Sequence, residues 1–372
     1  MIRKFALLML FLSFCTVCRA QSSVTLYGIL DQFVAYEHTS SGKSLVALGD
    51  GALARSRIGF KGVEDIGGGY QIIFQLESGF NADSGALADS SRLFDRQAWV
   101  GINTPVGQFR VGRQNSAAFN SSPEIDWSSR AMLTSIVNNF GLPGRYDDDI
   151  VYKSPRVYDF QIEAHYAMPG IAGGGLNRGA VYQIWVDWAH GPYQAAYVGT
   201  VAVPLASAIY KEVVQYHQFT ANYDYGRGKF YFAYIHSNNA TSSASGNDAV
   251  GILSAISVPN NYVLGTTPDV QRFYNVFQVS VDYRISPAFT IGALIGMIRD
   301  QSGQGNDVYG GNVGFIYSVS KRTSFYGSAG LMKNENNAGF RFSGSGAPPN
   351  FTGSDINGRN LIGLQLGILH LF

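Results

Sequence analysis

Apolar and polar residues alternate with a period of two over most of this sequence, and that pattern limits the possible folds more than any other feature. Successive side chains of a β-strand point to opposite faces, so a period of two predicts strands with one apolar and one polar face. After residue 20, no segment with helical periodicity exceeds two turns, and none reaches the roughly 18 apolar residues of a membrane helix. The chain is therefore predicted to be all-β. The clearest alternating runs are 24–37, 57–62, 71–77, 96–101 and 362–372.

Glycines, prolines and short polar clusters divide these runs into alternating short and long connections. Short turns are expected at 65–69, 104–107, 154–158, 190–192, 226–228, 285–287 and 320–322. Longer connections are expected at roughly 38–52, 80–91, 115–144, 170–179, 204–212, 238–270, 300–307 and 334–356. Seven short turns between eight long connections predict sixteen antiparallel strands. Short turns at one rim and long loops at the other are typical of outer-membrane β-barrels, and soluble sandwiches do not sort loop length by side in this way.

The composition favours a membrane barrel over two soluble domains of the same total length. The chain has 44 glycines, 22 tyrosines and 24 phenylalanines among 372 residues, but only 14% charged residues. Soluble proteins usually carry about 25% charged residues. A chain that is poor in charge and lacks membrane helices indicates strands whose lipid-facing and lumen-facing residues alternate. The formal net charge of +1 gives no indication of a nucleic-acid partner.

Residues 1–20 have the features of a secretory signal peptide. Arg3 and Lys4 form a basic region, Phe5–Phe14 is an apolar run, and small residues precede the expected cleavage point. The mature chain is expected to begin at Gln21 and to form a single barrel domain over 21–372. The leader carries three basic residues and no acidic ones, which leaves 24 basic and 26 acidic residues and a mature charge of −2.

Both cysteines, Cys15 and Cys18, lie inside this leader. The mature chain is therefore expected to have no disulfide, so an exported protein must gain its stability from another source such as a closed strand ladder. A lipoprotein signal is an alternative, but Phe14 and Val17 precede the cysteines where such a signal would place Gly or Ala.

The sequence ends with an amphipathic strand whose last residue is aromatic. This ending predicts a final strand that pairs with the first strand and closes the barrel, with Phe372 on the lipid side. The residues that share one face of this strand are Ile362, Leu364, Leu366, Ile368, His370 and Phe372.

Five short motifs lie on the predicted strands: SVTLYG (23–28), SRIGFKG (56–62), FQLE (74–77), RQAWVG (96–101) and GQFRVGR (107–113). Together they resemble the trimeric general porins of Gram-negative bacteria, and the neisserial and burkholderial type most closely. The resemblance follows the strand spacing through the whole mature chain and is strongest over 23–165 and at the C-terminus. One departure is His370, beside which relatives often place an arginine.

The resemblance implies a 16-stranded antiparallel transmembrane β-barrel in the bacterial outer membrane. Its third extracellular loop, here 115–144, would fold into the pore. The implied function is passive diffusion of small hydrophilic solutes and inorganic ions, without a cofactor. The implied partners are two further copies of the chain in a homotrimer, outer-membrane lipid and lipopolysaccharide.

The resemblance also implies a charged constriction in the pore. The loop segment 122–127 (SPEIDW) looks like the acidic tip that relatives place there. Arginines and a lysine are implied on and near the wall opposite. The expected constriction residues are Arg57, Lys61, Arg96, Arg113, Glu124, Asp126 and Arg145.

The residues themselves support inward-facing basic groups. Arg57, Lys61 and Arg96 alternate with residues that suit lipid, and a charge on the lipid face at mid-membrane costs about 2–4 kcal/mol. Arginine remains charged beside other cations, whereas a crowded lysine can lose its proton. A basic wall facing an acidic loop predicts a modest preference for anions. Asp31 is also expected to face inward.

No residue pattern indicates catalysis or a metal site. The six histidines lack metal-ligand or catalytic spacing and are expected near the rims, and neighbouring carboxylates in 147–149 would point to opposite faces of a strand. The chain is therefore not predicted to be an enzyme. Two alternatives to a general diffusion channel remain: a substrate-specific channel of the same fold, and a surface adhesin or receptor that uses loops such as 238–270.

Overall fold

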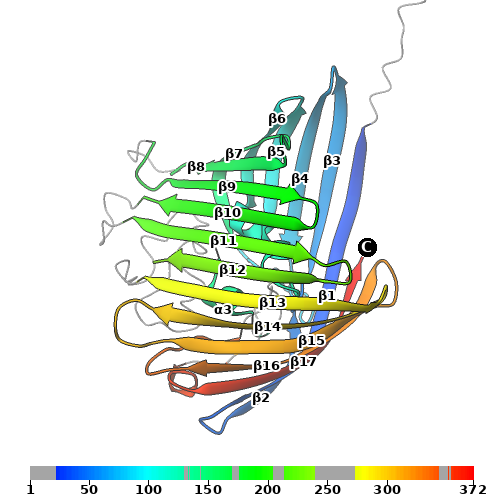
Figure 1. Cartoon of the computed structure of the whole chain (residues 1–372). Coiled ribbons are helices and arrows are strands. Elements are labelled where there is room, and N and C mark those ends of the chain that lie inside the picture. The colour runs from blue at the N-terminus through cyan, green and yellow to red at the C-terminus, as the bar shows by residue number, and fades with distance from the viewer. Residues whose placement is uncertain are drawn as a thin grey trace, which may run out of the picture.

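The computed structural model describes residues 22–129, 133, 135–142, 144–169, 176–203, 213–238, 273–342, 351 and 353–372. Within these residues the chain forms one antiparallel sheet that curves round on itself (Figure 1). Its first strands are β1 (Ser23–Thr39), β2 (Ser44–Asp50), β3 (Arg57–Gly67), β4 (Tyr70–Gly79), β5 (Gln97–Thr104), β6 (Gly107–Asn115), β7 (Arg145–Lys153) and β8 (Phe160–Ala167). The sheet continues through β9 (Val181–His190), β10 (Tyr193–Ala202), β11 (Val214–Asp224), β12 (Lys229–Ser237), β13 (Tyr274–Ser286), β14 (Phe289–Asp300), β15 (Val308–Ser318), β16 (Thr323–Asn334) and β17 (Asn360–Leu371).

The last strand closes the barrel against the first, as the sequence predicts. β17 pairs with β1 from Ile29↔Leu371 to Thr39↔Leu361. The ladder ends at Phe372, whose backbone exchanges hydrogen bonds of 3.0 and 3.1 Å with Gly28. A closed ladder leaves no free sheet edge, which is the condition for strands to cross a membrane.

The described residues contain seventeen strand segments but sixteen barrel strands, because one strand is interrupted. The first half of β1 pairs with β3 and its second half pairs with β2. β2 and β3 therefore follow one another along the same neighbour, separated by residues 51–56. The predicted count of sixteen is confirmed, while the predicted loop at 38–52 is wrong, since β2 occupies residues 44–50 of it.

Asp31 on β1 stabilises the interruption between β2 and β3. Its buried carboxylate accepts the backbone N–H groups of Leu53 and Ala54 at 2.8 and 2.7 Å, and it also accepts the hydroxyl of Tyr326 on β16. These bonds satisfy amides that the broken ladder leaves unpaired. The prediction that Asp31 faces inward is confirmed.

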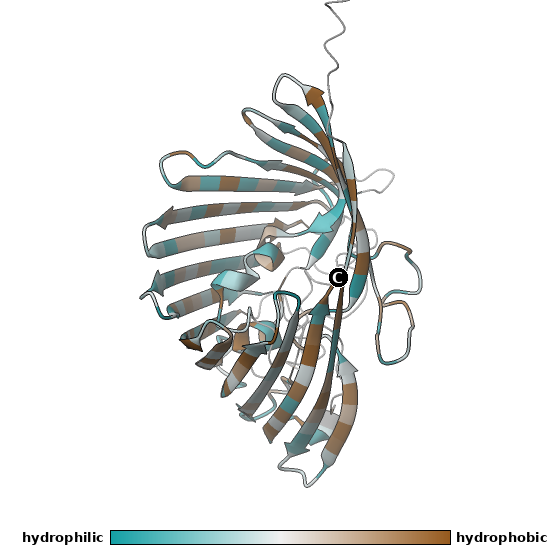
Figure 2. Cartoon of the chain, turned by 90° about the vertical axis from the view of Figure 1, so that its right-hand side faces the viewer, coloured by the Kyte–Doolittle hydropathy of each residue, from teal (hydrophilic) through white to brown (hydrophobic). Residues whose placement is uncertain are grey.

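Alternate residues of each strand face lipid or the inside of the barrel. On β17, Ile362, Leu364 and Leu366 are exposed, whereas the intervening Leu361 and Gln365 are buried. Bands of hydrophobic and hydrophilic colour alternate along the strands in the same way (Figure 2). Because apolar side chains are exposed on one face throughout, that face is the outer surface of the barrel.

The connections confirm the predicted asymmetry. Short turns join β3–β4, β5–β6, β7–β8, β9–β10, β11–β12, β13–β14 and β15–β16, and the connections at the opposite rim are longer except for residues 40–43 between β1 and β2. Large parts of the predicted loops at 170–179, 204–212, 238–270 and 334–356 lie outside the described residues, as does the predicted leader at 1–20. In the described part of the chain, no helix is both long and apolar enough to cross a membrane.

Candidate functional site

The connection between β6 and β7 is the segment predicted to narrow the pore. It contains α2 (Ala117–Asn120), η1 (Ser122–Glu124) and α3 (Ile136–Phe140). Its backbone N–H groups at Ala117 and Val137 donate to Gln183 on β9 and Gln278 on β13, at 2.6 and 3.2 Å. Both glutamines alternate with exposed apolar residues of their strands. The segment therefore contacts the inner face of the barrel across several strands.

Glycines on the inner face of β14 and β15 make room for two large side chains of this segment. A Cβ atom at Gly292 would lie 2.2 Å from the ring of Trp127, and one at Gly310 would lie 2.9 Å from Ile136. The indole N–H of Trp127 donates to Asn312 on β15 at 3.1 Å. A side chain at either glycine would displace the segment, so these residues position it on the wall.

The predicted Arg57 and Arg96 meet at a buried carboxylate on the inner wall. Arg96 Nε donates to Glu77 Oε1 at 2.6 Å, and Arg57 Nη1 lies 3.8 Å from the same oxygen. The hydroxyl of Tyr27 donates to Glu77 Oε2 at 2.9 Å. Arg96 precedes the first residue of β5, so its side chain is not bound by the alternation of that strand and reaches inward to Glu77.

Arg55 joins this pair, although the sequence did not single it out. It lies in the interruption between β2 and β3, and its Nη2 donates to Asn81 at 2.6 Å. A cavity of about 240 Å³ separates the three arginines from the β6–β7 connection, whose Phe119, Asn120, Ser122, Pro123 and Ser129 form the other side.

Arg145 extends the basic wall at the start of β7. Its guanidinium lies 4.7 Å from the centre of the Phe119 ring. Its Nε and Nη2 atoms are buried without a hydrogen-bond partner, and no ion pair is found for it among the described residues. Its charge is therefore stabilised by the aromatic face and is not neutralised by a carboxylate.

Arg113 and Lys61 contribute differently from the other basic residues. Arg113 Nη1 donates to Asp147 at 2.5 Å, and Arg92 binds the same carboxylate through two bonds of 3.0 and 2.9 Å. Lys61 is exposed and lies 5.5 Å from the centre of the Tyr27 ring. It stands four residues along β3 from Arg57, about 13 Å towards the short-turn rim. The structure therefore does not bring Lys61 to the arginine cluster.

The two predicted acidic residues lie on other parts of the wall. Glu124 accepts a hydrogen bond from Gln194 on β10 at 3.0 Å. Its burial and the nearby carboxylate of Asp187 raise the pKa of Glu124 to about 8. Asp126 is buried and accepts bonds of 2.7 Å from Ser135 Oγ and 2.9 Å from Gln278 Nε2. The bond from Gln278 fastens the connection to β13, and the bond from Ser135 lies within the connection.

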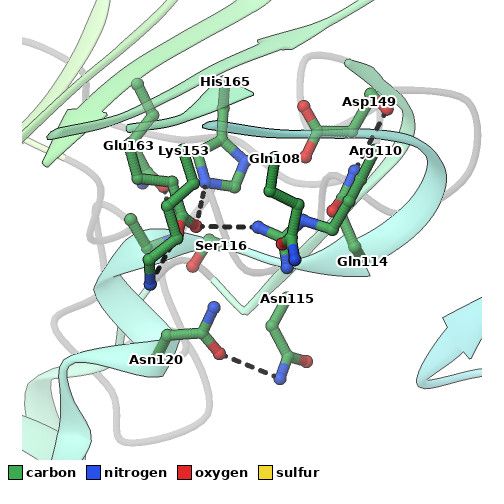
Figure 3. A network of polar contacts seen from close by, with 12 residues as sticks. Gln108, Arg110, Gln114, Asn115, Ser116, Asn120, Asp149, Lys153, Glu163 and His165 are labelled. Carbon is green, nitrogen blue, oxygen red and sulfur yellow. Dashed lines mark hydrogen bonds and ion pairs between the residues drawn. The ribbon is translucent and has the colours of Figure 1, made fainter. Parts of the chain in front are cut away.

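A second polar network on β6–β8 was missed by the sequence analysis (Figure 3). His165 is fully buried, with Nδ1 2.7 Å from Asp149 and Nε2 2.9 Å from Glu163. Arg110 and Lys153 also bind Glu163, at 3.1 and 3.3 Å. His165 lies two residues before the end of β8, but its burial between two carboxylates was not predicted. Within the described residues, no group of three or more His, Cys, Asp or Glu side chains has a geometry suited to a metal ion.

A closed barrel with an apolar outer face and charged groups on its inner wall defines an outer-membrane channel protein. The chain belongs to the Gram-negative porin family, whose profile matches residues 6–337. It is thus a porin of the bacterial outer membrane, as the resemblance implied.

Several porins share sequence similarity with the chain. Outer membrane porin protein 32 of Delftia acidovorans is 26% identical over 373 residues, covering 95% of both chains. Major outer membrane protein P.IB of Neisseria gonorrhoeae is 26% identical over 344 residues, covering 84% of this chain and 89% of its own length. An outer membrane porin protein of Bordetella pertussis is 32% identical over 176 residues, covering 41% of this chain and 45% of its own length.

Solved structures share the fold at lower sequence identity. The anion-selective porin from Comamonas acidovorans has a TM-score of 0.76 at 21% identity, with 94% of this chain and 100% of that chain covered. OmpF of Salmonella typhi has a TM-score of 0.65 at 14% identity, with 94% and 97% covered.

Proposed function

We propose that the chain forms a water-filled channel for passive diffusion of small hydrophilic solutes, with a mild preference for anions. The narrow section would lie between the β6–β7 connection and the wall that carries Arg55, Arg57, Arg96 and Arg145. The observation that supports it is the charge balance around the 240 Å³ cavity. Arg55, Arg57 and Arg96 line this cavity, and Arg57 and Arg96 share one carboxylate, that of Glu77.

The charge beside the narrow section should determine the ion preference more strongly than the net charge of the mature chain. The mature chain is slightly acidic, but wide vestibules are screened within about 10 Å at 0.1 M salt. The narrow section sets the barrier to ion passage. Glu124 weakens this positive field little at neutral pH, because its raised pKa keeps most of it protonated. The anion selectivity named for the Comamonas acidovorans porin is in keeping with this proposal.

Planar-bilayer reversal potentials of the wild-type protein test this function. Chloride should pass more readily than potassium, and the preference should increase at low salt as screening weakens. Flux of small neutral sugars should rise linearly with concentration and should not saturate. A cation preference, or the absence of any conductance, would contradict the proposal.

A substrate-specific channel is the second candidate, and one observation favours it. On the inner wall, Arg110 lies 5.5 Å from the ring of Trp99, and Lys153 lies 5.0 Å from that of Trp185. Alternating aromatic and basic groups of this kind can bind a solute by its apolar and anionic parts. Saturation of flux by a single solute would favour this function over general diffusion.

The family membership and the apolar outer surface further support a homotrimer in contact with outer-membrane lipid, including lipopolysaccharide. The first strands carry a broad set of exposed apolar residues that a neighbouring copy could cover. These are Val24, Leu26, Leu30, Val34, Val46, Leu48, Ile58 and Phe60. An adhesin role is not favoured by any described residue, and the loop 238–270 lies almost wholly outside them.

A further inference from the structure

Segment 51–56 places one arginine of the wall without the support of a strand. Arg55 lines the 240 Å³ cavity together with Arg57 and Arg96. Arg57 is the first residue of β3 and Arg96 directly precedes β5, whereas residues 51–56 belong to neither β2 nor β3. The position of Arg55 therefore depends on whatever fixes this irregular segment.

A single residue of β1, Asp31, binds the segment along its length. The N–H group of Gly51 donates to the backbone carbonyl of Asp31 at 2.8 Å. The carboxylate oxygen Oδ2 accepts the N–H groups of Leu53 and Ala54 at 2.8 and 2.7 Å. The N–H group of Asp31 donates to Ser56 Oγ at 2.9 Å. These bonds fix the backbone on both sides of the arginine.

A phenol from β16 holds the carboxylate of Asp31 from the other side. Tyr326 is the direct neighbour of Gly367 on β17, and the hydroxyl of Tyr326 donates to Asp31 Oδ1 on β1. A Cβ atom at Gly367 would lie 2.3 Å from that hydroxyl oxygen. Glycine at position 367 therefore lets the phenol cross β17 and reach Asp31, and both polar side chains are buried.

The guanidinium of Arg55 has few contacts of its own that could fix it. Its Nη2 donates to Asn81 at 2.6 Å, while its Nε is buried and has no hydrogen-bond partner among the described residues. Without the carboxylate of Asp31, the N–H groups of Leu53 and Ala54 would have to find another acceptor. The segment would then move, and the arginine would move with it.

We infer that Asp31 is a positioning residue for ion selectivity, which holds Arg55 at the cavity and is itself held by Tyr326 and Gly367. The inference rests on the proposed anion preference of the channel. It reverses the sign that charge alone would give. Removal of an acidic group beside a pore normally favours anions. Removal of this one should disfavour them, because Arg55 leaves the cavity.

Reversal potentials of Asp31→Ala and Asp31→Asn test this inference. Asp31→Ala removes all the bonds of the carboxylate, and it should lower the chloride-to-potassium permeability ratio to that of Arg55→Gln. Asp31→Asn removes only the charge, because its amide oxygen can accept both backbone N–H groups and its NH₂ group can donate to the Tyr326 hydroxyl. This variant should keep or exceed the wild-type ratio.

Three further variants separate an effect through Arg55 from a general loss of structure. Asp31→Ala/Arg55→Gln should have the same ratio as Arg55→Gln alone, since residues that act through one another are not additive. Tyr326→Phe and Gly367→Ala should lower the ratio in the same direction but less strongly. They provide the same comparison if Asp31→Ala does not insert into the membrane.

The matched control is Asp300→Ala at the end of β14. The carboxylate of Asp300 likewise accepts two backbone N–H groups, from Ser302 at 2.9 Å and from Asn306 at 3.3 Å. This control should keep the wild-type ratio. An unchanged or higher ratio in Asp31→Ala, an equal loss in Asp31→Asn, or an equal loss in the control would overturn the inference.

A thiol at position 55 tests the positioning without reference to selectivity. The sequence after residue 20 has no cysteine, so Arg55→Cys adds a single thiol. Its modification by an anionic methanethiosulfonate, followed as a change in conductance, should become faster when Asp31→Ala is added and stay unchanged with Asp31→Asn. Equal rates in all three backgrounds would overturn the inference. A wild type that prefers potassium would contradict the proposed function instead, and this rate would still decide whether Asp31 positions the segment.

Discussion

Arg145 shows how a residue can keep a positive charge on the inner wall without a carboxylate. Its guanidinium rests on the ring of Phe119 at 4.7 Å. Arg57 and Arg96 instead share Glu77, and Arg92 and Arg113 share Asp147. The carboxylate of Asp147 partly neutralises the charge of Arg113, whereas no described carboxylate does this for Arg145. In the proposed channel, we therefore expect Arg145 to contribute more to the electrostatic field than the paired arginines do.

Glu124 should make ion selectivity depend on pH. Its pKa of about 8 means that it is neutral below pH 8 and charged above it. We therefore expect the chloride preference to fall as pH rises through 8, because a negative charge then appears on the β6–β7 connection that faces the arginine wall. The raised pKa of Glu124 should also make the free energy of unfolding fall as pH rises from 4.5 towards 8. In this range the carboxyl group has lost its proton in the unfolded chain but keeps it in the folded chain.

Reversal potentials between pH 6 and 10 would measure this effect, with Glu124→Gln as the variant and the exposed Asp83→Asn as its control. The Glu124 variant should show a flat profile, whereas the control should follow the wild type. A profile that is unchanged in Glu124→Gln would show that another group causes the pH dependence.

At the scale of elements, contacts with several strands hold the β6–β7 connection against the inner wall. Trp127 fills the space left by Gly292 and bonds to Asn312, while Asp126 fastens the same turn to Gln278. The loss of one of these large buried side chains should loosen the connection around it.

Trp127→Ala should loosen this connection and raise single-channel conductance. Truncation of a buried tryptophan usually costs about 3–5 kcal/mol, and here that loss falls on the anchoring of the loop. Trp188→Ala, on the outer face of β9, removes a tryptophan of equal size and should leave conductance unchanged. Equal conductance in the wild type and the Trp127 variant would show that the segment does not limit the flow.

The strands could be predicted because alternation is a local property of the chain, and it located the closing strand, while glycines and prolines located the short turns. The interruption at 51–56 could not be predicted, because it depends on residues that are distant in sequence. Asp31 accepts a backbone N–H group of this segment and also the hydroxyl of Tyr326. Glu77 was missed as a site residue since nothing local marks a carboxylate that will meet Arg96. The inward glycines of β14 and β15 leave a signal in the sequence, because Gly292 and Gly296 recur on the same face of one strand.

At the scale of the whole molecule, a closed ladder takes the place of disulfides. The sequence after residue 20 has no cysteine, and hydrogen bonds between β1 and β17 complete the ring. Exposed apolar residues cover the outer surface, and cyclic assemblies commonly cover part of such a surface.

We expect the mature protein to run as a trimer. Unheated detergent extracts should migrate near three times the mature mass and collapse to one third on boiling. A double variant of the first strands, Val24→Ser/Leu26→Ser, should weaken the trimer more than Val279→Ser/Ile295→Ser at exposed positions of β13 and β14. A fully active monomer in mild detergent would contradict this expectation.

The central claim is that the arginine wall sets the ion preference of the channel, and the most direct measurement is the reversal potential of Arg55→Gln/Arg57→Gln/Arg145→Gln. Arg96 is kept, so that Glu77 does not lose its 2.6 Å partner. The matched control is Arg227→Gln/Lys321→Gln/Arg322→Gln, which removes three exposed cations from the short-turn rim. The account predicts that the chloride preference falls or reverses in the wall variant and persists in the control. An unchanged preference in the wall variant, or an equal change in the control, would contradict it.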